Sequence, residues 1–170
     1  MMGASYPVNG ADLRRACGRF ATGVAVVTAR AGTVVVGMTI NSFSSVSLDP
    51  PLVLWSIRNS ARSRDIFESA GAFAISILSS EQEFVAGRFA AGNADAFDGA
   101  DTLPSPAGLP FIAGAIAHLD CTTYDVRDGG DHRILIGSVD SLAVHEGCPL
   151  LFYDGRIVSR LAPIASSVTP

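Results

Sequence analysis

The chain has 170 residues, of which 48% are hydrophobic and 16% charged, a length and balance that predict one folded domain rather than a disordered chain. Its 12 basic residues are all arginines, so mechanisms that need a Schiff-base lysine or the lysine of a phosphate-binding P-loop are excluded. The net charge of −4 argues against the broad basic face of a nucleic-acid-binding protein.

The chain opens with a predicted helix and a β-hairpin. Apolar residues at helical spacing indicate a short amphipathic helix over Asp12–Ala21, with Asn9 as its N-cap. Two β-branched runs, Val24–Ala29 and Thr33–Asn41, follow on either side of an Ala-Gly turn. These runs predict an antiparallel hairpin.

The middle of the chain alternates between strands, loops and short helices. A serine-rich stretch, Ser42–Pro51, is predicted as a loop with a rigid Asp-Pro-Pro end. Beyond it we expect a strand over Leu52–Ile57, a helix over Asn59–Ala70, a strand over Ala72–Leu78 and a helix over Glu81–Ala90, the last opened by a capping box at Ser80–Glu83.

The last part of the chain is predicted to be mostly β. Ala91–Pro110 carries several glycines and prolines and only short apolar pieces, so we expect a long surface loop there, a kind of segment that tends to be functional in compact domains. Two long strands, Ile112–Val126 and Arg133–Val144, then flank a glycine-rich turn. A final hairpin is expected from Leu150–Tyr153 and Arg156–Ser159 around an Asp-Gly turn.

The connections between these elements indicate the fold class. About eight strands and three short helices, joined mostly as hairpins, favour a mainly β antiparallel barrel over a doubly wound α/β sheet. No internal repeat or linker divides the chain. We therefore expect a single domain over residues 1–170, with its core at about 11–160 and with tails at 1–10 and 161–170.

The first candidate site is Gly37–Pro51, where a predicted strand ends among hydroxyl and amide side chains. Together with free backbone N–H groups, these side chains offer alternating hydrogen-bond donors and acceptors, which suit the rim of a flat heteroaromatic ring. Serine-rich loops are also common as plain polar surface turns, and composition alone weighs the two interpretations about equally.

The second candidate site is Ser56–Arg64, which leaves a strand and opens a predicted helix. Backbone N–H groups at a helix start, with arginine and serine nearby, can bind a phosphate; the alternative is a solvated basic edge. Both candidate sites flank the strand Leu52–Ile57. A ring site at one end of that strand and a phosphate site at the other would suit a single phosphorylated cofactor.

The third candidate is the tight turn Gly129–His132, which places His132 at the start of a strand. An imidazole there can donate or accept hydrogen bonds and titrates near neutral pH, although a turn histidine is more often structural. No G-x-S-x-G elbow supports a serine hydrolase, and no G-x-G-x-x-G follows a strand to support a Rossmann site.

Apolar runs, cysteines and histidines bear on location and metal content. No run reaches the roughly 18 apolar residues of a membrane helix, and Met1–Gly10 lacks the pattern of a signal peptide. The cysteines, Cys17, Cys121 and Cys148, are odd in number and widely spaced, so we expect no disulfides, thiols buried as small hydrophobes, and a cytoplasmic protein without membrane association. His118 and Cys121 would face opposite sides of a strand, so no metal site is expected.

Six segments, taken in order, carry a pattern that extends over about residues 11–160: Gly23–Thr28, Gly37–Val53, Phe73–Leu78, Arg88–Ala90, Gly130–His132 and Pro149–Tyr153. The stretch ending in Ser-Leu-Asp-Pro-Pro, paired with the later Gly-Asp-His, is its most specific part. The pattern resembles the flavin reductase-like family, small NAD(P)H:flavin oxidoreductases that serve two-component monooxygenases.

The resemblance implies an antiparallel Greek-key split β-barrel with a few short helices, which binds FMN or FAD and forms a homodimer. It also implies that the isoalloxazine ring lies against Thr39, Asn41, Ser42, Ser44 and Ser45. By the same resemblance, the phosphate or pyrophosphate binds to the segment from Ser56 to Ser63, chiefly to Arg62 and Ser63. Phe89 would lie near the flavin, and His132 would bind the nicotinamide nucleotide.

The implied reaction is hydride transfer from the nicotinamide C4 of NADH or NADPH to the flavin N5, with reduced flavin passing to a separate oxygenase component. This step needs no general base, which fits a chain without a recognisable triad or metal site. Backbone N–H groups near Ser42–Ser45 would stabilise negative charge on the reduced flavin. Two alternatives stay open: a non-catalytic flavin-binding or carrier protein on the same fold, and a structural dimer with an empty barrel.

Overall fold

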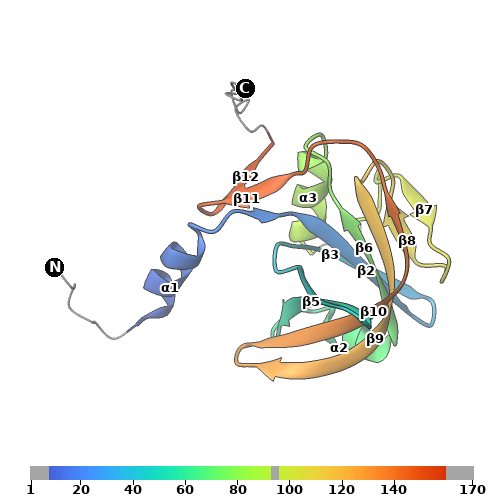
Figure 1. Ribbon diagram of the computed structural model, residues 1–170, viewed down its shortest axis with the longest axis horizontal. Helices are drawn as coiled ribbons and strands as arrows, with labels where there is room; N and C mark the ends of the chain where they lie inside the picture. The colour runs from blue at the N-terminus through green and yellow to red at the C-terminus, as the bar shows by residue number, and fades with distance from the viewer. Residues whose placement is uncertain (1–7, 93–95, 160–170) are drawn as a thin grey trace.

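Strands dominate the computed structural model of the chain, which describes residues 8–92 and 96–159 (Figure 1). Within these residues there are twelve strands and three helices, and every strand pair is antiparallel. The prediction of a mainly β, antiparallel fold is confirmed. Residues 1–7 and 160–170, which include most of the two predicted tails, lie outside the described residues.

The main sheet is built from seven strands: β2 (Ala25–Ala31), β3 (Val34–Ile40), β4 (Ser44–Leu48), β5 (Pro51–Arg58), β6 (Ala72–Ile77), β9 (Ala117–Gly129) and β10 (His132–Val144). Their order is β3-β2-β6-β9-β10-β5-β4. The two edge strands, β3 and β4, are therefore consecutive in sequence, and a connection this short spans at most about 14 Å. The sheet must curl until its edges approach each other, which gives the split barrel that the resemblance implies, with a seam between β3 and β4.

Smaller elements surround this barrel. They are α1 (Gly10–Cys17), β1 (Thr22–Gly23), α2 (Arg64–Ser69), α3 (Glu83–Ala90), β7 (Thr102–Pro104), β8 (Pro110–Ile112), β11 (Leu151–Tyr153) and β12 (Arg156–Val158). Strands β1, β11 and β12 form a three-stranded sheet, and β7 pairs with β8. In Figure 1, α1 stands away from the barrel, whereas α2 and α3 lie against it. None of the helices in the described residues is long and apolar enough to cross a bilayer.

The barrel strands bury side chains on both of their faces. In β2, all five residues from Ala25 to Ala29 are buried. On the inner face Trp55 packs edge-on against Phe67 of α2 and Phe73 of β6, with ring centroids 4.9 and 5.8 Å apart. On the other face Phe89 of α3 is fully buried in a second apolar cluster. Aromatic residues thus fix both helices to the barrel, in keeping with the large area that such side chains bury.

Two segments predicted as loops contain strands. The prediction for Ser42–Pro51 is wrong because β4 forms there by pairing with β5, although only one of the five β4 residues is even half-buried. Ala91–Pro110 contains β7 and the first residue of β8. Ile112 consequently belongs to β8, and the long strand predicted to begin there starts at Ala117 instead.

The first helix has the predicted cap but a different extent. The side-chain oxygen of Asn9 accepts hydrogen bonds from the N–H groups of Ala11 and Asp12, as expected of an N-cap. The helix ends at Cys17, four residues before the predicted end. None of its side chains is buried, so the predicted apolar stripe is not covered by any of the residues that the structure describes.

The other two helices are also shorter than predicted. Helix α2 begins at Arg64 rather than at Asn59. In the backbone before it, the N–H of Asn59 bonds to the carbonyl of Asp131, and the N–H groups of Ala61 and Arg64 close short turns. Helix α3 begins at Glu83, and the predicted capping box is wrong: the N-cap residue, Gln82, makes no side-chain capping bond. The Gln82 amide instead accepts from the N–H of Ser79 and donates to the carbonyl of Ala113.

Candidate functional site

One serine hydroxyl fixes the connection between the two edge strands to β5. Ser42 lies in the three-residue connection between β3 and β4, and its Oγ accepts a hydrogen bond from the N–H of Ser56 at 3.0 Å. The same oxygen lies 3.3 Å from the Ser56 carbonyl, to which it donates. Ser42 thereby fixes the connection against the end of β5 and places the neighbouring Asn41 at the opening of the seam.

Two cavities open at this seam. The first, called the polar cavity, has a volume of about 450 Å³ and is lined by the end of β3, the end of β5 and His132. The second, called the apolar cavity, has a volume of about 640 Å³ and extends along β3 between α2 and α3. Both cavities are lined by Met38, Ala61 and Ala90, so they adjoin and can hold two parts of one ligand or two ligands in contact.

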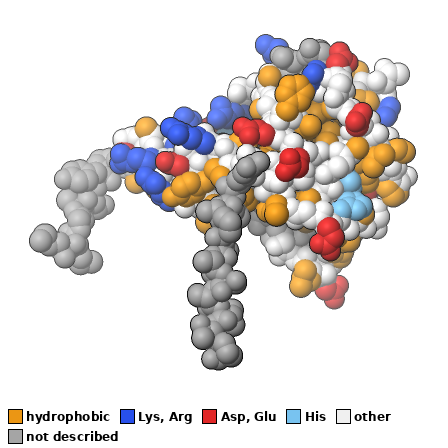
Figure 2. All heavy atoms as spheres, turned by 90° about the horizontal axis from the view of Figure 1, so that it is seen from above, with side chains coloured by type: hydrophobic (Ala, Val, Ile, Leu, Met, Phe, Trp, Pro, Cys, Tyr) orange, Lys and Arg blue, Asp and Glu red, His pale blue; other side chains and the backbone are white. Residues whose placement is uncertain are grey.

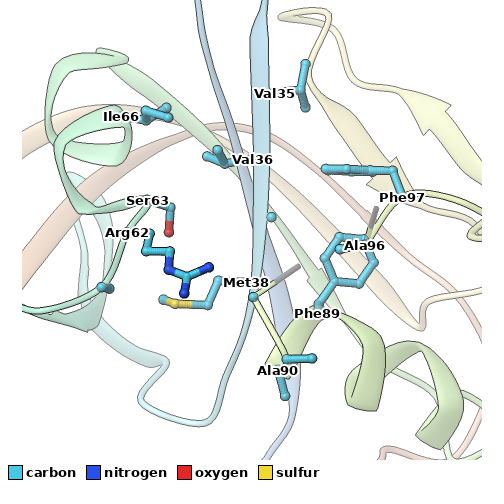
Figure 3. Close-up of a pocket in the computed structure, with 14 residues that line it drawn as sticks. Val35, Val36, Met38, Arg62, Ser63, Ile66, Phe89, Ala90, Ala96 and Phe97 are labelled. Carbon is cyan, nitrogen blue, oxygen red and sulfur yellow. The ribbon is translucent and has the colours of Figure 1, made fainter. Parts of the chain in front are cut away.

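Most of the site residues predicted from the sequence line one of these cavities. The polar cavity is lined by Thr39, Asn41, Ser42, Ser56 and His132. The apolar cavity is lined by Arg62, Ser63 and Phe89 (Figure 3). Two predicted residues line neither: Ser44 and Ser45 are exposed residues of β4, paired with Leu54 and Val53.

The expected arrangement at opposite ends of one strand is wrong. Ser42 bonds to Ser56, close to the carboxyl end of β5, and Arg62 follows that same end by four residues. The antiparallel pairing of β4 with β5 brings both segments to one end of β5, so the ring-binding and phosphate-binding candidates lie close together there. Figure 3 shows Arg62 beside Met38, the residue common to both cavities.

Packing between β3 and α3 shapes the apolar cavity. The hydroxyl of Thr39 donates to the carbonyl of Ala86 at 2.7 Å, so this side chain holds β3 to α3. A Cβ at Gly37 would lie 2.5 Å from a ring carbon of Phe89, closer than any real contact. Phe89 in turn meets Phe97 edge-on at 5.0 Å. A residue without a side chain is therefore required for the aromatic wall to sit this close to the strand.

The arginines that follow β5 differ in their partners. The Arg64 guanidinium donates to Asp65 at 2.6 and 2.9 Å and to the carbonyl of Asn59 at 3.1 Å. The guanidinium groups of Arg58 and Arg62 make no hydrogen bond or ion pair with any residue in the described part of the chain, and each residue lines a cavity. These two guanidinium groups are the ones available to an anionic ligand.

His132 is oriented by its neighbour in the turn. Its Nδ1 lies 2.7 Å from the carboxylate of Asp131, and this hydrogen bond holds the pKa of Asp131 below its ordinary value. An ionised carboxylate only accepts hydrogen bonds, so Nδ1 carries the proton. The Nε2 atom is then the ring nitrogen of His132 left to bind a ligand in the polar cavity.

The turn that carries His132 is tied to the end of β5 by Asn59. The N–H of Asn59 donates to the carbonyl of Asp131 at 2.9 Å, and its side-chain amide donates to the carbonyl of Gly130 at 3.0 Å. The sequence interpretation did not single out Asn59. The only local signal is that asparagine after a strand often bonds to nearby backbone, and here its partner lies 71 residues further along the chain.

Metal and thiol chemistry have no visible part in the site. No group of three or more His, Cys, Asp or Glu residues within the described ranges is placed to hold a metal ion. The three cysteines are free thiols; Cys121 is buried as predicted, whereas Cys17 and Cys148 are exposed, which contradicts the prediction for those two. Burial raises the pKa of Cys121 to about 12, so this thiol stays neutral.

The chain belongs to the family described as the flavin reductase like domain, which matches residues 17–160. The family resemblance inferred from the sequence is confirmed.

Particular relatives are similar over most of their length. The chain is 44% identical to the FMN reductase (NADH) SmoA of Agrobacterium fabrum, over 86% of this chain and 84% of that protein. It is 39% identical to the reductase subunit HsaB of a flavin-dependent monooxygenase of Rhodococcus jostii, over 90% of this chain and 79% of that one. The solved NADH:FAD oxidoreductase SgcE6 of Streptomyces globisporus, in complex with NAD and FAD fragments, has a TM-score of 0.87 and 41% identity, covering 95% and 99% of the two chains.

Proposed function

We propose that this protein is an NAD(P)H:flavin oxidoreductase that transfers a hydride from a dihydronicotinamide nucleotide to FMN or FAD. The observation that carries the proposal is the pair of adjoining cavities at the barrel seam, one with an imidazole and the other with a free guanidinium. The named relatives SmoA and SgcE6 are reductases of FMN and FAD that use NADH, which supports NADH as the donor.

The side chains present fit a flavin. Arg62 has no ion pair or hydrogen bond in the described part of the chain, and beside it lies Ser63, a hydroxyl donor suited to phosphate. The side-chain amide of Asn41 is likewise unbonded within the described residues and lines the polar cavity, where it can bind the polar rim of a heteroaromatic ring. We therefore assign the flavin phosphate to Arg62 and Ser63, and the ring edge to Asn41.

The chain's own residues do the binding and orienting. Ser42 and Thr39 use their hydroxyls within the fold: Ser42 bonds to β5, and Thr39 bonds to α3. We therefore assign both residues the role of shaping the site. His132, with its Nδ1 proton held by Asp131, orients the nicotinamide through Nε2. A flavin bound here would supply the redox chemistry by accepting the hydride. The protein thus contributes orientation and exclusion of water rather than acid or base groups.

We extend the proposal to a separate oxygenase component that receives the reduced flavin. The relative HsaB is named as the reductase subunit of a flavin-dependent monooxygenase. We also propose the cytoplasm as the location, since three free thiols suit a reducing compartment. The extent of the single domain, with a core at about 11–160, remains part of this proposal.

We propose further that two copies associate through the α1 region, meaning α1 and the residues after it up to Phe20. Figure 2 shows this region projecting from the body of the molecule, with arginine and hydrophobic side chains on its surface. Leu13 is 54% exposed and Phe20 76% exposed, and no residue of α1 is buried. A short helix without buried side chains gains little stability alone, which favours burial against a second copy. Light scattering tests this: Leu13→Glu should give a monomer, and Val34→Glu, which changes another exposed apolar residue, should not.

The reductase proposal is tested by mixing the purified protein with NADH or NADPH and with free FMN or FAD, and following donor oxidation. Turnover with at least one combination is expected. No turnover with any combination, together with measurable flavin binding, would show the non-catalytic carrier instead. Absence of both turnover and flavin binding would leave the empty structural barrel as the correct alternative.

A further inference from the structure

We infer that Arg58 binds the phosphate that adjoins the nicotinamide ribose of the hydride donor. This inference rests on the proposed function, because it takes His132 as the residue that binds the nicotinamide. It goes further by assigning a second, separate anion site to Arg58, which the sequence interpretation placed only within the flavin-phosphate segment Ser56–Ser63 and which the proposed flavin contacts do not use.

The pairing of β5 and β10 places Arg58 next to His132. Their Cα atoms are partners in the ladder, which is regular from His132–Arg58 to Ser138–Leu52. Directly opposed residues in an antiparallel pair point to the same face, with Cβ atoms about 4.5–5.5 Å apart. Both residues line the polar cavity, as does Ser56, which lies two positions before Arg58 on the same face of β5.

Arg58 is also free of competing partners. Its guanidinium makes no hydrogen bond or ion pair with any described residue, and Asp131 acts on it only as a nearby charge. The Asp131 carboxylate is itself bonded to His132. Arg64, by contrast, is held by Asp65, Glu68 and the carbonyl of Asn59 and is not available.

The length of the side chain selects the phosphate. The side chain of an arginine is longer than that of the histidine beside it. If the nicotinamide is bound to His132, the guanidinium of Arg58 can therefore reach the group on the far side of the attached ribose. In any nicotinamide nucleotide that group is a phosphate, and a guanidinium can bind a phosphate through two parallel hydrogen bonds, in bidentate fashion.

Two anionic ligands in adjoining cavities also need separate positive charges. If a flavin phosphate lies on Arg62, a second phosphate close by would be repelled unless it met its own cation. Arg58 supplies that cation in the polar cavity, and Arg62 does so in the apolar cavity. The two ligands can then bind together without competing for one guanidinium.

Truncated donors separate this role from a structural one. We would compare Arg58→Gln with the wild-type protein, both loaded with flavin, using NADH, reduced nicotinamide mononucleotide and reduced nicotinamide riboside, of which only the riboside lacks the phosphate. The variant should lower kcat/KM for the first two donors about 10- to 100-fold, as expected for a hydrogen bond to a charged group. It should leave kcat/KM for the riboside unchanged, and Arg58→Lys should restore part of the loss because it keeps the charge.

Two further measurements make every outcome decisive. Arg156→Gln, which removes an exposed arginine of β12 that lines neither cavity, should behave as wild type. NADH binding, followed by its fluorescence, should weaken in Arg58→Gln by the same factor. An equal loss with the riboside, or a weaker flavin affinity in place of weaker NADH binding, would overturn the inference alone. A wild-type protein that neither oxidises nor binds NADH would overturn the proposed function as well.

Discussion

The hydroxyl of Ser42, in the connection between β3 and β4, is hydrogen-bonded to both the N–H and the carbonyl of Ser56 in β5. One side chain thus joins the connection between the edge strands to the strand that leads into the arginine segment. The polar cavity is lined by both residues, so its shape depends on this pair of bonds.

Replacing Ser42 with alanine removes both bonds and leaves the N–H of Ser56 without its partner. We expect the free energy of unfolding to fall by about 1–2 kcal/mol and the flavin dissociation constant to rise several-fold. Ser44→Ala is the matched control, because the exposed hydroxyl of Ser44 bonds only to the carbonyl of the next residue. Urea unfolding and flavin titration of both variants check this, and equal stability of the two would contradict it.

The side chain of Asn59 predicts a selective effect on the donor. Asn59→Ala and Asn59→Asp both remove the N–H that donates to Gly130, so the turn carrying His132 loses one of the two hydrogen bonds that Asn59 makes to it. We expect the KM for NADH to rise roughly 3- to 10-fold in both variants, while the flavin dissociation constant stays near the wild-type value. Steady-state kinetics at saturating flavin measure this. A wild-type KM in Asn59→Asp would show that the donated hydrogen bond is unimportant.

Two glycine substitutions should have opposite signs. Gly37→Ala would place a methyl group 2.5 Å from the Phe89 ring, which cannot move freely because it is fully buried. We expect a loss of about 1–3 kcal/mol in the free energy of unfolding and a weaker flavin affinity. Gly87→Ala meets nothing within 4 Å and lies inside α3, where alanine is preferred to glycine by about 1 kcal/mol. Thermal unfolding of the pair would refute this reasoning if both variants shifted in the same direction.

Burial of Cys121 predicts a pH dependence of stability. Its pKa rises from 9.0 to about 12 on folding, so between these values the unfolded chain loses a proton that the folded chain keeps, and stability must fall as the pH rises. From pH 8 to pH 10 this one thiol should lower the free energy of unfolding by about 1.4 kcal/mol. The free energy of unfolding of Cys121→Ala should therefore fall by about 1.4 kcal/mol less than that of wild type over the same range. Cys148→Ala, which changes an exposed thiol, should show the same pH dependence as wild type. Parallel slopes for wild type and Cys121→Ala would contradict the assignment.

Local signals in the sequence were enough to predict the parts of the fold that are set by neighbouring residues. The β2–β3 hairpin follows from two β-branched runs around a glycine turn, and the cap of α1 follows from Asn9. The turn at Gly130 likewise placed His132 at the start of a strand. The family resemblance then led to most of the residues that line the two cavities.

Features that depend on distant contacts were missed. Strand β4 has no alternation of apolar residues and exists because it pairs with β5. The segment before α2 forms turns instead of a helix, and Asn59 within it bonds to a turn 71 residues away. The placing of Ser42 and Arg62 at the same end of β5 follows from the antiparallel pairing of β4 with β5, which is missed when Ser42–Pro51 is predicted as a loop. The site was thus predictable in its residues but not in its arrangement.

The central claim is that the apolar cavity binds the flavin phosphate while the polar cavity binds the nicotinamide. The most direct test measures the flavin dissociation constant and the KM for NADH side by side in Arg62→Gln and His132→Ala. Arg62→Gln should raise the flavin dissociation constant about 10- to 100-fold with little change in the KM for NADH at saturating flavin. His132→Ala should raise the KM for NADH roughly 3- to 10-fold with unchanged flavin affinity. If His132→Ala weakens flavin binding instead, or if both variants affect the same ligand, the two-cavity assignment is wrong.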